Sequence, residues 1–146
     1  MKLPIVSRRE LEDALERHES LLAEFQNYKR RTASAETAAR LAGENSAFQE
    51  LLPVYDNLQR ALEQSCQDEA FVRGIQMTMD SLLRSMEKLG IQEIPAMSCQ
   101  FDPRLHEAME HIEDPELDEN TITRVILTGF RRGDTVLRHA LVVVAN

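Results

Sequence analysis

Hydrophobic positions in the first half of the chain recur every three or four residues, from about residue 8 to about residue 66. The side chains that begin this stripe are Leu11, Leu15, His18, Leu22 and Phe25. Such heptad spacing predicts one long helix with a narrow apolar face. A helix of this length would measure about 80 Å, far more than a domain of this size can cover. We therefore expect the stripe to pack against a second copy of the chain.

The stripe weakens in the middle of the predicted helix. After Ala35 it consists mainly of alanines, and Gly43 costs about 1 kcal/mol of helix stability relative to alanine. Larger side chains then resume the pattern, namely Phe48, Leu52, Tyr55, Leu58 and Leu62. Pro53 lacks a backbone donor and clashes with the preceding turn, so a kink or a local break is expected there. The long helix is therefore not expected to be uniformly stable.

A second helix is predicted from about Asp68 to Leu89. Asp68 is a suitable N-cap, Lys88 lies in the last turn and Gly90 is a stop signal. The apolar face of this helix contains Phe71, Ile75, Met79, Leu82, Met86 and Leu89. Because the link at residues 64–67 is short, the two helices are expected to be antiparallel, and two such hairpins would form a dimeric four-helix bundle.

After Gly90 the hydrophobic period changes from helical to alternating. Strands are predicted at residues 91–94, 122–127 and 135–144. Residues 131–134 are predicted to be the hairpin turn between the last two strands. One helical turn is expected after Asp102, since Pro103 suits the first position of a helix.

The two periods together predict an α+β fold with three regions. These are a short flexible N-terminus at residues 1–7, a helical dimerisation region at 8–90, and a small β-rich domain at 91–146. The 146-residue chain has no Trp and only 5% aromatic residues, so any compact core must be small. The β-rich part is small for an independent fold, and attachment to the helices is expected to support it.

Charge and cysteine content exclude several classes of function. The formal net charge of −8 opposes non-specific binding to nucleic acid or to an anionic membrane. No apolar run approaches the roughly 20 residues that a membrane-spanning helix needs. The start of the chain carries no secretory h-region, and Cys66 and Cys99 are far apart, so we expect reduced thiols in a cytoplasmic protein.

One candidate metal site is rejected on its spacing. His106, Glu107 and His111 resemble a metal-binding helix pattern, but histidines five residues apart lie about 140° apart around a helix. The chain also contains no glycine-rich phosphate loop, nucleophile elbow or paired-carboxylate motif. We therefore expect no metal, no cofactor and no catalytic residue.

The basic cluster of Lys29, Arg30 and Arg31 lies within the apolar stripe of the first helix. A basic helix beside a coiled coil is typical of leucine-zipper DNA-binding proteins. The cluster is short, however, and apolar seam residues flank it on both sides, while the net charge is −8. DNA binding is therefore disfavoured. A solvated helix face and a docking surface for an acidic protein partner remain open.

Several segments resemble the GrpE family when taken in their order and spacing. They are residues 27–32 (NYKRRT), 51–58 (LLPVYDNL) with Ala61 and Leu62, Gly74-Ile75 with Met77-Thr78, Leu89-Gly90-Ile91, Phe101-Asp102-Pro103 with His106-Glu107-Ala108, Gly129-Phe130, Leu137-Arg138, and residues 142–145 (VVVA). The resemblance covers about residues 25–146.

This resemblance implies a non-enzymatic nucleotide exchange factor. GrpE-like proteins are homodimers of long helices, a four-helix bundle and two β-domains. One β-domain binds the ATPase domain of a DnaK-type chaperone and opens its cleft, so that ADP leaves. The factor itself binds no nucleotide. The alternative reading is a coiled-coil adaptor or scaffold without exchange activity.

The resemblance also implies which residues bind the chaperone. They are Phe101, Pro103, Ile126 and Val144 in the β-domain, Glu63 and Gln64 at the end of the long helix, Gly74 in the second helix, and Lys29 with Arg30 and Arg31. For Phe101 and Ile126, a role in the β-domain core remains open. The dimer interface is expected to include Leu11, Leu15, Leu22, Phe25, Phe48, Leu52, Tyr55, Leu58, Leu62, Ile75 and Leu82.

The chain departs from the family pattern at a few positions. Thr128 stands where a basic residue is common, and Asp134-Thr135 replaces another basic position. Charge contacts with the partner are therefore expected to be missing or relocated to Arg131 and Arg132. The family's acidic N-terminal arm is expected to play no part here. Temperature sensing by melting of residues 8–45 is a further expectation.

Overall fold

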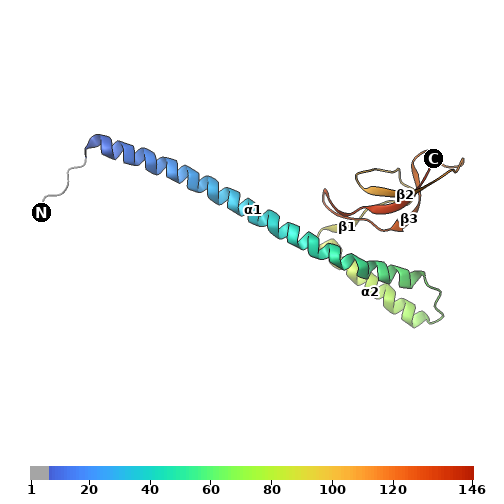
Figure 1. The fold of residues 1–146 in the computed structure, drawn as a ribbon. Helices are drawn as coiled ribbons and strands as arrows, with labels where there is room; N and C mark the ends of the chain where they lie inside the picture. The colour runs from blue at the N-terminus through green and yellow to red at the C-terminus, as the bar shows by residue number, and fades with distance from the viewer. Residues whose placement is uncertain (1–6) are drawn as a thin grey trace. The chain divides into compact units, whose positions relative to one another are not determined.

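The computed structural model describes residues 7–146 and has an α+β fold, as predicted (Figure 1). The predicted flexible N-terminus at residues 1–7 lies outside the described residues except for Ser7. The elements are α1 (Arg8–Glu63), α2 (Glu69–Lys88), β1 (Ile91–Glu93), β2 (His106–Ile112), β3 (Thr121–Leu127), β4 (Phe130–Arg132), β5 (Thr135–Arg138) and β6 (Ala140–Ala145).

The chain divides into two units, residues 1–44 and 45–146. In the first unit, α1 begins with a capping box in which the Ser7 hydroxyl accepts from Glu10 N–H and the Glu10 carboxylate accepts from Ser7 N–H. Hydrogen bonding of the Glu10 carboxylate to the Ser7 backbone N–H, and then to the Ser7 side chain, lowers the pKa of Glu10. Every described side chain from Ser7 to Glu44 is exposed. The apolar stripe therefore has no cover within its own unit.

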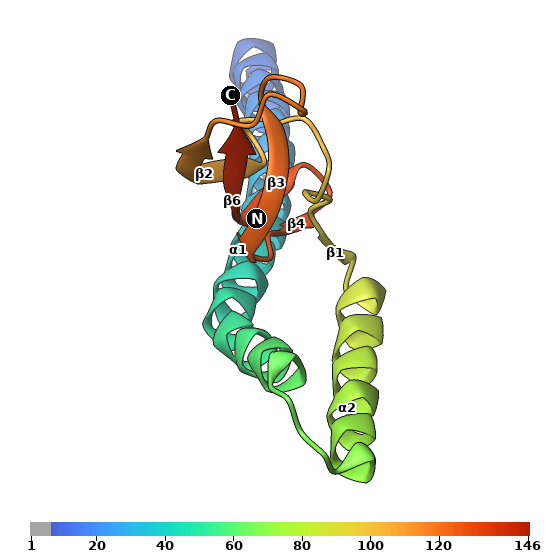
Figure 2. The same ribbon diagram turned by 90° about the vertical axis from the view of Figure 1, so that its right-hand side faces the viewer.

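The second unit contains the end of α1, which continues through Pro53 to Glu63. Of the two predicted outcomes at Pro53, the local break is therefore absent, while α1 bends within its last part (Figure 2). Packing accounts for this continuity, because the neighbouring Leu52 and Tyr55 are buried against other elements of the same unit.

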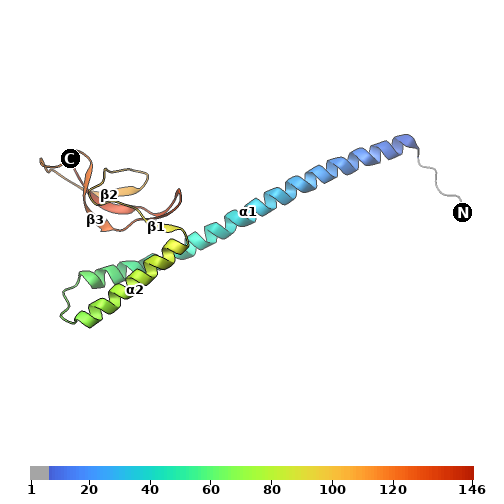
Figure 3. The ribbon, with the colours of Figure 1, turned by 180° about the vertical axis from the view of Figure 1, so that it is seen from behind.

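The helix α2 has the two ends that its sequence predicts. The Asp68 carboxylate accepts hydrogen bonds from the N–H groups of Ala70 and Phe71 at 3.0 and 3.1 Å. At the other end, Gly90 adopts a φ of 74°, which glycine accommodates without strain. Figures 2 and 3 show the hairpin that α2 forms with the end of α1.

Residues 91–146, which we call the β-module, form two three-stranded sheets. One has the order β1-β4-β5 and is antiparallel, and the other has the order β2-β6-β3. In the second sheet β6 lies in the centre, parallel to β2 and antiparallel to β3 (Figure 2).

The structure corrects the strand prediction at three places. The predicted strand at 135–144 is two strands, because the chain passes from one sheet to the other at His139. The predicted turn at 131–134 is shorter, since Arg131 and Arg132 belong to β4 and Gly133 turns with a φ of 56°. Where a helical turn was predicted after Asp102, a non-helical turn leads into β2, which was not predicted.

Two hydrophobic clusters hold the second unit together. The first joins α1, α2 and the β1-β4-β5 sheet and contains Phe48, Leu52, Tyr55, Met79, Met86, Ile91, Phe130 and Leu137. The second lies in the β-module around Ile94, Ala96, Ile122, Ala140, Val142 and Val144. Phe48, Leu52 and Tyr55 were predicted at the dimer interface, yet this packing already buries them within one chain.

Candidate partner-binding surface

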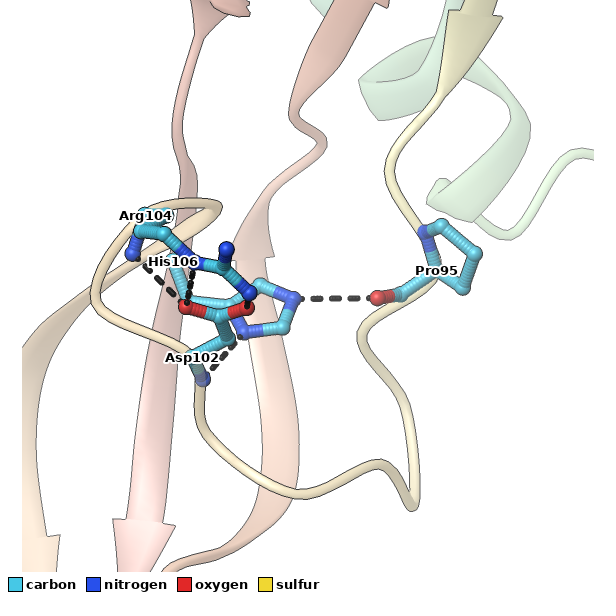
Figure 4. Close-up of polar contacts among 4 residues, drawn as sticks. All are labelled: Pro95, Asp102, Arg104 and His106. Carbon is cyan, nitrogen blue, oxygen red and sulfur yellow. Dashed lines mark hydrogen bonds and ion pairs between the residues drawn. The ribbon is translucent and has the colours of Figure 1, made fainter. Parts of the chain in front are cut away.

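The turn that carries Phe101 and Pro103 is fixed by the backbone and side chain of Asp102. The Asp102 carbonyl accepts from the N–H groups of Leu105 and His106 at 2.9 and 2.8 Å. The Asp102 carboxylate accepts from the Arg104 backbone N–H at 2.9 Å and pairs with its guanidinium, with an N–O distance of 2.9 Å (Figure 4). Pro103 is exposed at the tip, and Phe101 is half-buried.

His106 supports this turn from inside. It is only 4% exposed, and its Nδ1 accepts from the Asp102 N–H at 3.0 Å. Its Nε2 lies 3.0 Å from the Pro95 carbonyl oxygen (Figure 4). Because that oxygen is an acceptor, the arrangement assigns the neutral tautomer with hydrogen on Nε2. His106 therefore ties the 101–105 turn to the segment after β1.

The charge of Asp102 is well stabilised at this surface. Hydrogen bonds from the Arg104 side chain, and then from its backbone, lower the pKa of Asp102 to about 2. The same pairing raises the pKa of Arg104. The turn thus presents an apolar proline beside a neutralised ion pair that is open to solvent.

The two other β-module residues expected at the partner surface differ in exposure. Ile126 is 41% exposed on β3 and lines a surface depression with Met109, Glu110 and Arg124. Val144 is 0% exposed and belongs to the second cluster. The expectation of a direct Val144 contact is therefore corrected, because neighbouring strands and side chains cover it.

The helical candidates are exposed. Glu63 ends α1, and Gln64 follows it in the link to α2. Gly74 lies on α2, where an added Cβ would meet no atom within 4 Å. The basic cluster belongs to the first unit, where Lys29 Nζ lies 5.9 Å from the Phe25 ring centroid and Arg30 donates to Asn27.

Comparison with known proteins decides the family. The family model described as GrpE matches residues 6–146. A relative named Protein GrpE from Clostridium acetobutylicum is 41% identical over 137 residues, which cover 94% of this chain and 68% of that protein. Relatives of the same name are 36% identical in Staphylococcus carnosus (94% and 71% covered) and 39% identical in Clostridium beijerinckii (86% and 60% covered).

The chain belongs to the GrpE family. This confirms the resemblance that the sequence motifs indicated, and it places the chain among co-chaperones of the nucleotide exchange type. Within residues 7–146, no helix is long and apolar enough to cross a bilayer. The same residues contain no group of three or more His, Cys, Asp or Glu side chains that could hold a metal ion.

Sequence reasoning missed one polar cluster of this GrpE chain. Arg138 on β5 binds Asp56 on α1 through two N–O contacts of 2.7 Å. Both residues lie in the family motifs, but they are 82 positions apart. In the sequence, each of the two residues is a charge in an otherwise apolar segment, and the two charges are opposite in sign. This pattern alone does not show that the two side chains pair with each other.

Proposed function

We propose that this GrpE-family chain is a nucleotide exchange factor for a cytoplasmic DnaK-type chaperone. It binds the ATPase domain, favours the open form of the nucleotide cleft and accelerates the release of ADP. The chain itself makes or breaks no bond and holds no nucleotide. Its action rests on differential affinity, since the factor binds the open cleft more tightly and ADP binds the closed cleft more tightly.

The observation that carries this proposal is the ordered turn at residues 101–105 at the surface of the β-module. Buried His106 fixes the turn from both ring nitrogens, and Pro103 is exposed. A surface that is already ordered loses less conformational freedom when a partner binds. More of the binding free energy of such a surface is then available to stabilise the open cleft.

We further propose that the protein acts as a homodimer through the apolar stripe of α1. Leu11, Leu15, Leu22 and Phe25 are each between 45% and 57% exposed in the single chain. A stripe of this kind gains stability when a second helix covers it. The alanine-rich middle and Gly43 make this pairing weak enough to melt, which supports temperature sensing as part of the proposed function.

Stopped-flow release of a fluorescent ADP analogue from the DnaK-type protein of the same organism tests the proposal. Substoichiometric amounts of the full chain should accelerate release. Ile126→Asp should reduce the effect, whereas Leu117→Asp should not, because Leu117 is 38% exposed in the loop before β3, at the opposite end of that strand from Ile126. Binding to the chaperone without acceleration would favour the adaptor interpretation and contradict exchange activity.

A further inference from the structure

We propose that Arg138 and Asp56 form a positioning pair that sets the orientation of the β-module on the helical hairpin. The inference rests on the proposed exchange function. It adds that the pair serves cleft opening and makes no direct contribution to chaperone binding. Arg138 comes from β5 and Asp56 from α1, and both belong to the unit 45–146.

The guanidinium of Arg138 links three parts of this unit. Its Nη1 and Nη2 each lie 2.7 Å from one oxygen of Asp56. Nη2 and Nε also donate to the Thr128 carbonyl oxygen at 2.7 and 3.1 Å. The Thr128 hydroxyl in turn donates to the Gln59 side chain at 3.3 Å. One cation therefore connects β5, the loop between β3 and β4, and the helix α1.

The apolar contact beside the pair holds the β-module against α1 but does little to fix its orientation. Phe130 is 0% exposed and packs edge-to-face against Tyr55, with ring centroids 4.9 Å apart. Apolar burial is roughly proportional to area and is not directional. A bidentate guanidinium–carboxylate pair fixes the distance and the relative plane of its two partners. Orientation is thus the property that the pair adds to the cluster.

A second polar contact supports this assignment. The Tyr55 hydroxyl donates to the Glu93 carboxylate of β1 at 2.7 Å. Tyr55 and Asp56 are consecutive residues, so their side chains leave α1 about 100° apart around the helix axis. The β1-β4-β5 sheet is therefore bonded to α1 in two directions around the helix axis, and this resists rotation of the β-module about the helix.

The energetics favour a positioning role over a simple contribution to stability. The Arg138 and Asp56 side chains are 19% and 16% exposed, so both lose much of their hydration. In such partly buried pairs the cost of desolvation offsets much of the Coulomb attraction. What remains is the directional constraint. A lever that opens a cleft needs this constraint, because a loose connection would bind the chaperone without transmitting force.

Asp56→Asn and Arg138→Gln test the proposal in the stopped-flow release assay with the full chain. We expect chaperone affinity to change by less than about twofold, because the hydrogen bonds of these two side chains join them to each other and to the Thr128 carbonyl oxygen, and not to the residues proposed to bind the chaperone. The maximal release rate at saturating factor should fall about tenfold or more, as steps that depend on geometry do when positioning is lost. Arg138→Lys keeps the positive charge but loses the bidentate geometry of the guanidinium. Its maximal release rate should lie between those of the wild type and Arg138→Gln.

Asp80→Asn is the matched control. Asp80 is a half-buried helical carboxylate whose hydrogen bond comes from Gln76 on its own helix at 2.9 Å. This variant should keep both affinity and maximal rate. If Asp56→Asn left the maximal rate unchanged, or lowered affinity and rate in the same proportion, the positioning role would be wrong. The exchange activity of the wild type would stand in either case.

Residual dipolar couplings give a readout that does not depend on exchange. In the wild type, one alignment tensor should fit the amides of both α2 and β6. In Asp56→Asn the couplings of β6 should shrink relative to those of α2 while both elements remain folded. A single tensor of unchanged magnitude in the variant would refute the pair's positioning role, even if the chain accelerated no ADP release.

Discussion

The two units of this GrpE chain differ in whether a single chain buries their hydrophobic side chains. In residues 8–44 every side chain is exposed, although the helix carries a regular apolar stripe. In residues 45–146 two clusters bury aromatic and branched side chains inside one chain. In line with the proposed homodimer, we infer that a second molecule stabilises the first unit, whereas the second unit largely supplies its own stability.

This difference separates two properties that an exchange factor needs. Helicity that depends on association can respond to temperature and concentration. A surface supported by an internal core keeps its shape under the same changes. We infer that the first unit adjusts the activity and that the second unit performs it.

The largest expected effect comes from truncating the centre of the first cluster. Phe130→Ala should lower the free energy of unfolding of residues 45–146 by about 3–5 kcal/mol, because Phe130 is fully buried against Phe48, Tyr55 and Arg138. Chemical denaturation followed by β-module signals measures this loss. Phe25→Ala is the control, since Phe25 is 57% exposed in the single chain. It should weaken self-association and leave the β-module stable. Equal losses in both variants would contradict the separation of the units.

The same substitution at two glycines should have opposite signs. A Cβ at Gly129 would lie 2.4 Å from the Ala140 backbone nitrogen, so Gly129→Ala should destabilise the β-module by about 1–3 kcal/mol. A Cβ at Gly43 meets nothing within 4 Å, so Gly43→Ala should stabilise α1 by about 1 kcal/mol. Circular dichroism should show the helical transition of Gly43→Ala at a higher temperature. A wild type with a single coincident helical and β transition would count against independent melting.

Alkaline pH should affect the second unit through Tyr55. Burial, and then the hydrogen bond to Glu93, raises the pKa of Tyr55 from 10.0 to about 12. Because the folded pKa is the higher one, the contribution of Tyr55 to stability is complete below pH 10 and is lost as the pH rises to about 12. This loss should be about 1–2 kcal/mol and smaller in Tyr55→Phe.

Ultraviolet absorbance of tyrosinate can follow this titration. The chain has two tyrosines and no Trp, so in a Tyr28→Phe background the signal comes from Tyr55 alone. A Tyr55 midpoint near pH 10 in the folded protein would show that the phenol is not buried as described.

The smallest expected change in stability is at Gly74. Gly74→Ala should stabilise α2 by about 0.5–1 kcal/mol, since an added Cβ has open space. If this face docks on the chaperone, the same variant should slow ADP release although the protein is more stable. Faster unfolding would contradict the helical assignment, and unchanged release would remove Gly74 from the proposed surface.

The sequence predicted the features of this fold that depend on local contacts. The Asp68 cap and the Gly90 stop involve residues within one helical turn, and both were found. The strand β2 was missed because most of its side chains are polar or exposed, and its partner β6 is distant in the chain. The division at His139 depends on which sheet each strand joins, and periodicity carries no such information.

The candidate surface was predicted in part for the same reason. The family resemblance suggested Pro103 and Ile126, and both side chains are exposed, as a partner-binding surface requires. They also suggested Val144, whose burial follows from the central position of β6. The Arg138–Asp56 pair required the three-dimensional fold, because its members lie 82 residues apart.

The thermodynamic linkage between ADP and this chain tests the central claim most directly. Titration of the chaperone ATPase domain with the full chain, at increasing ADP, should show an apparent Kd that rises to a plateau. The Kd of ADP should rise by the same factor when the chain is saturating, as reciprocity requires. A chain that binds equally well to the empty and the ADP-filled ATPase domain would contradict the account.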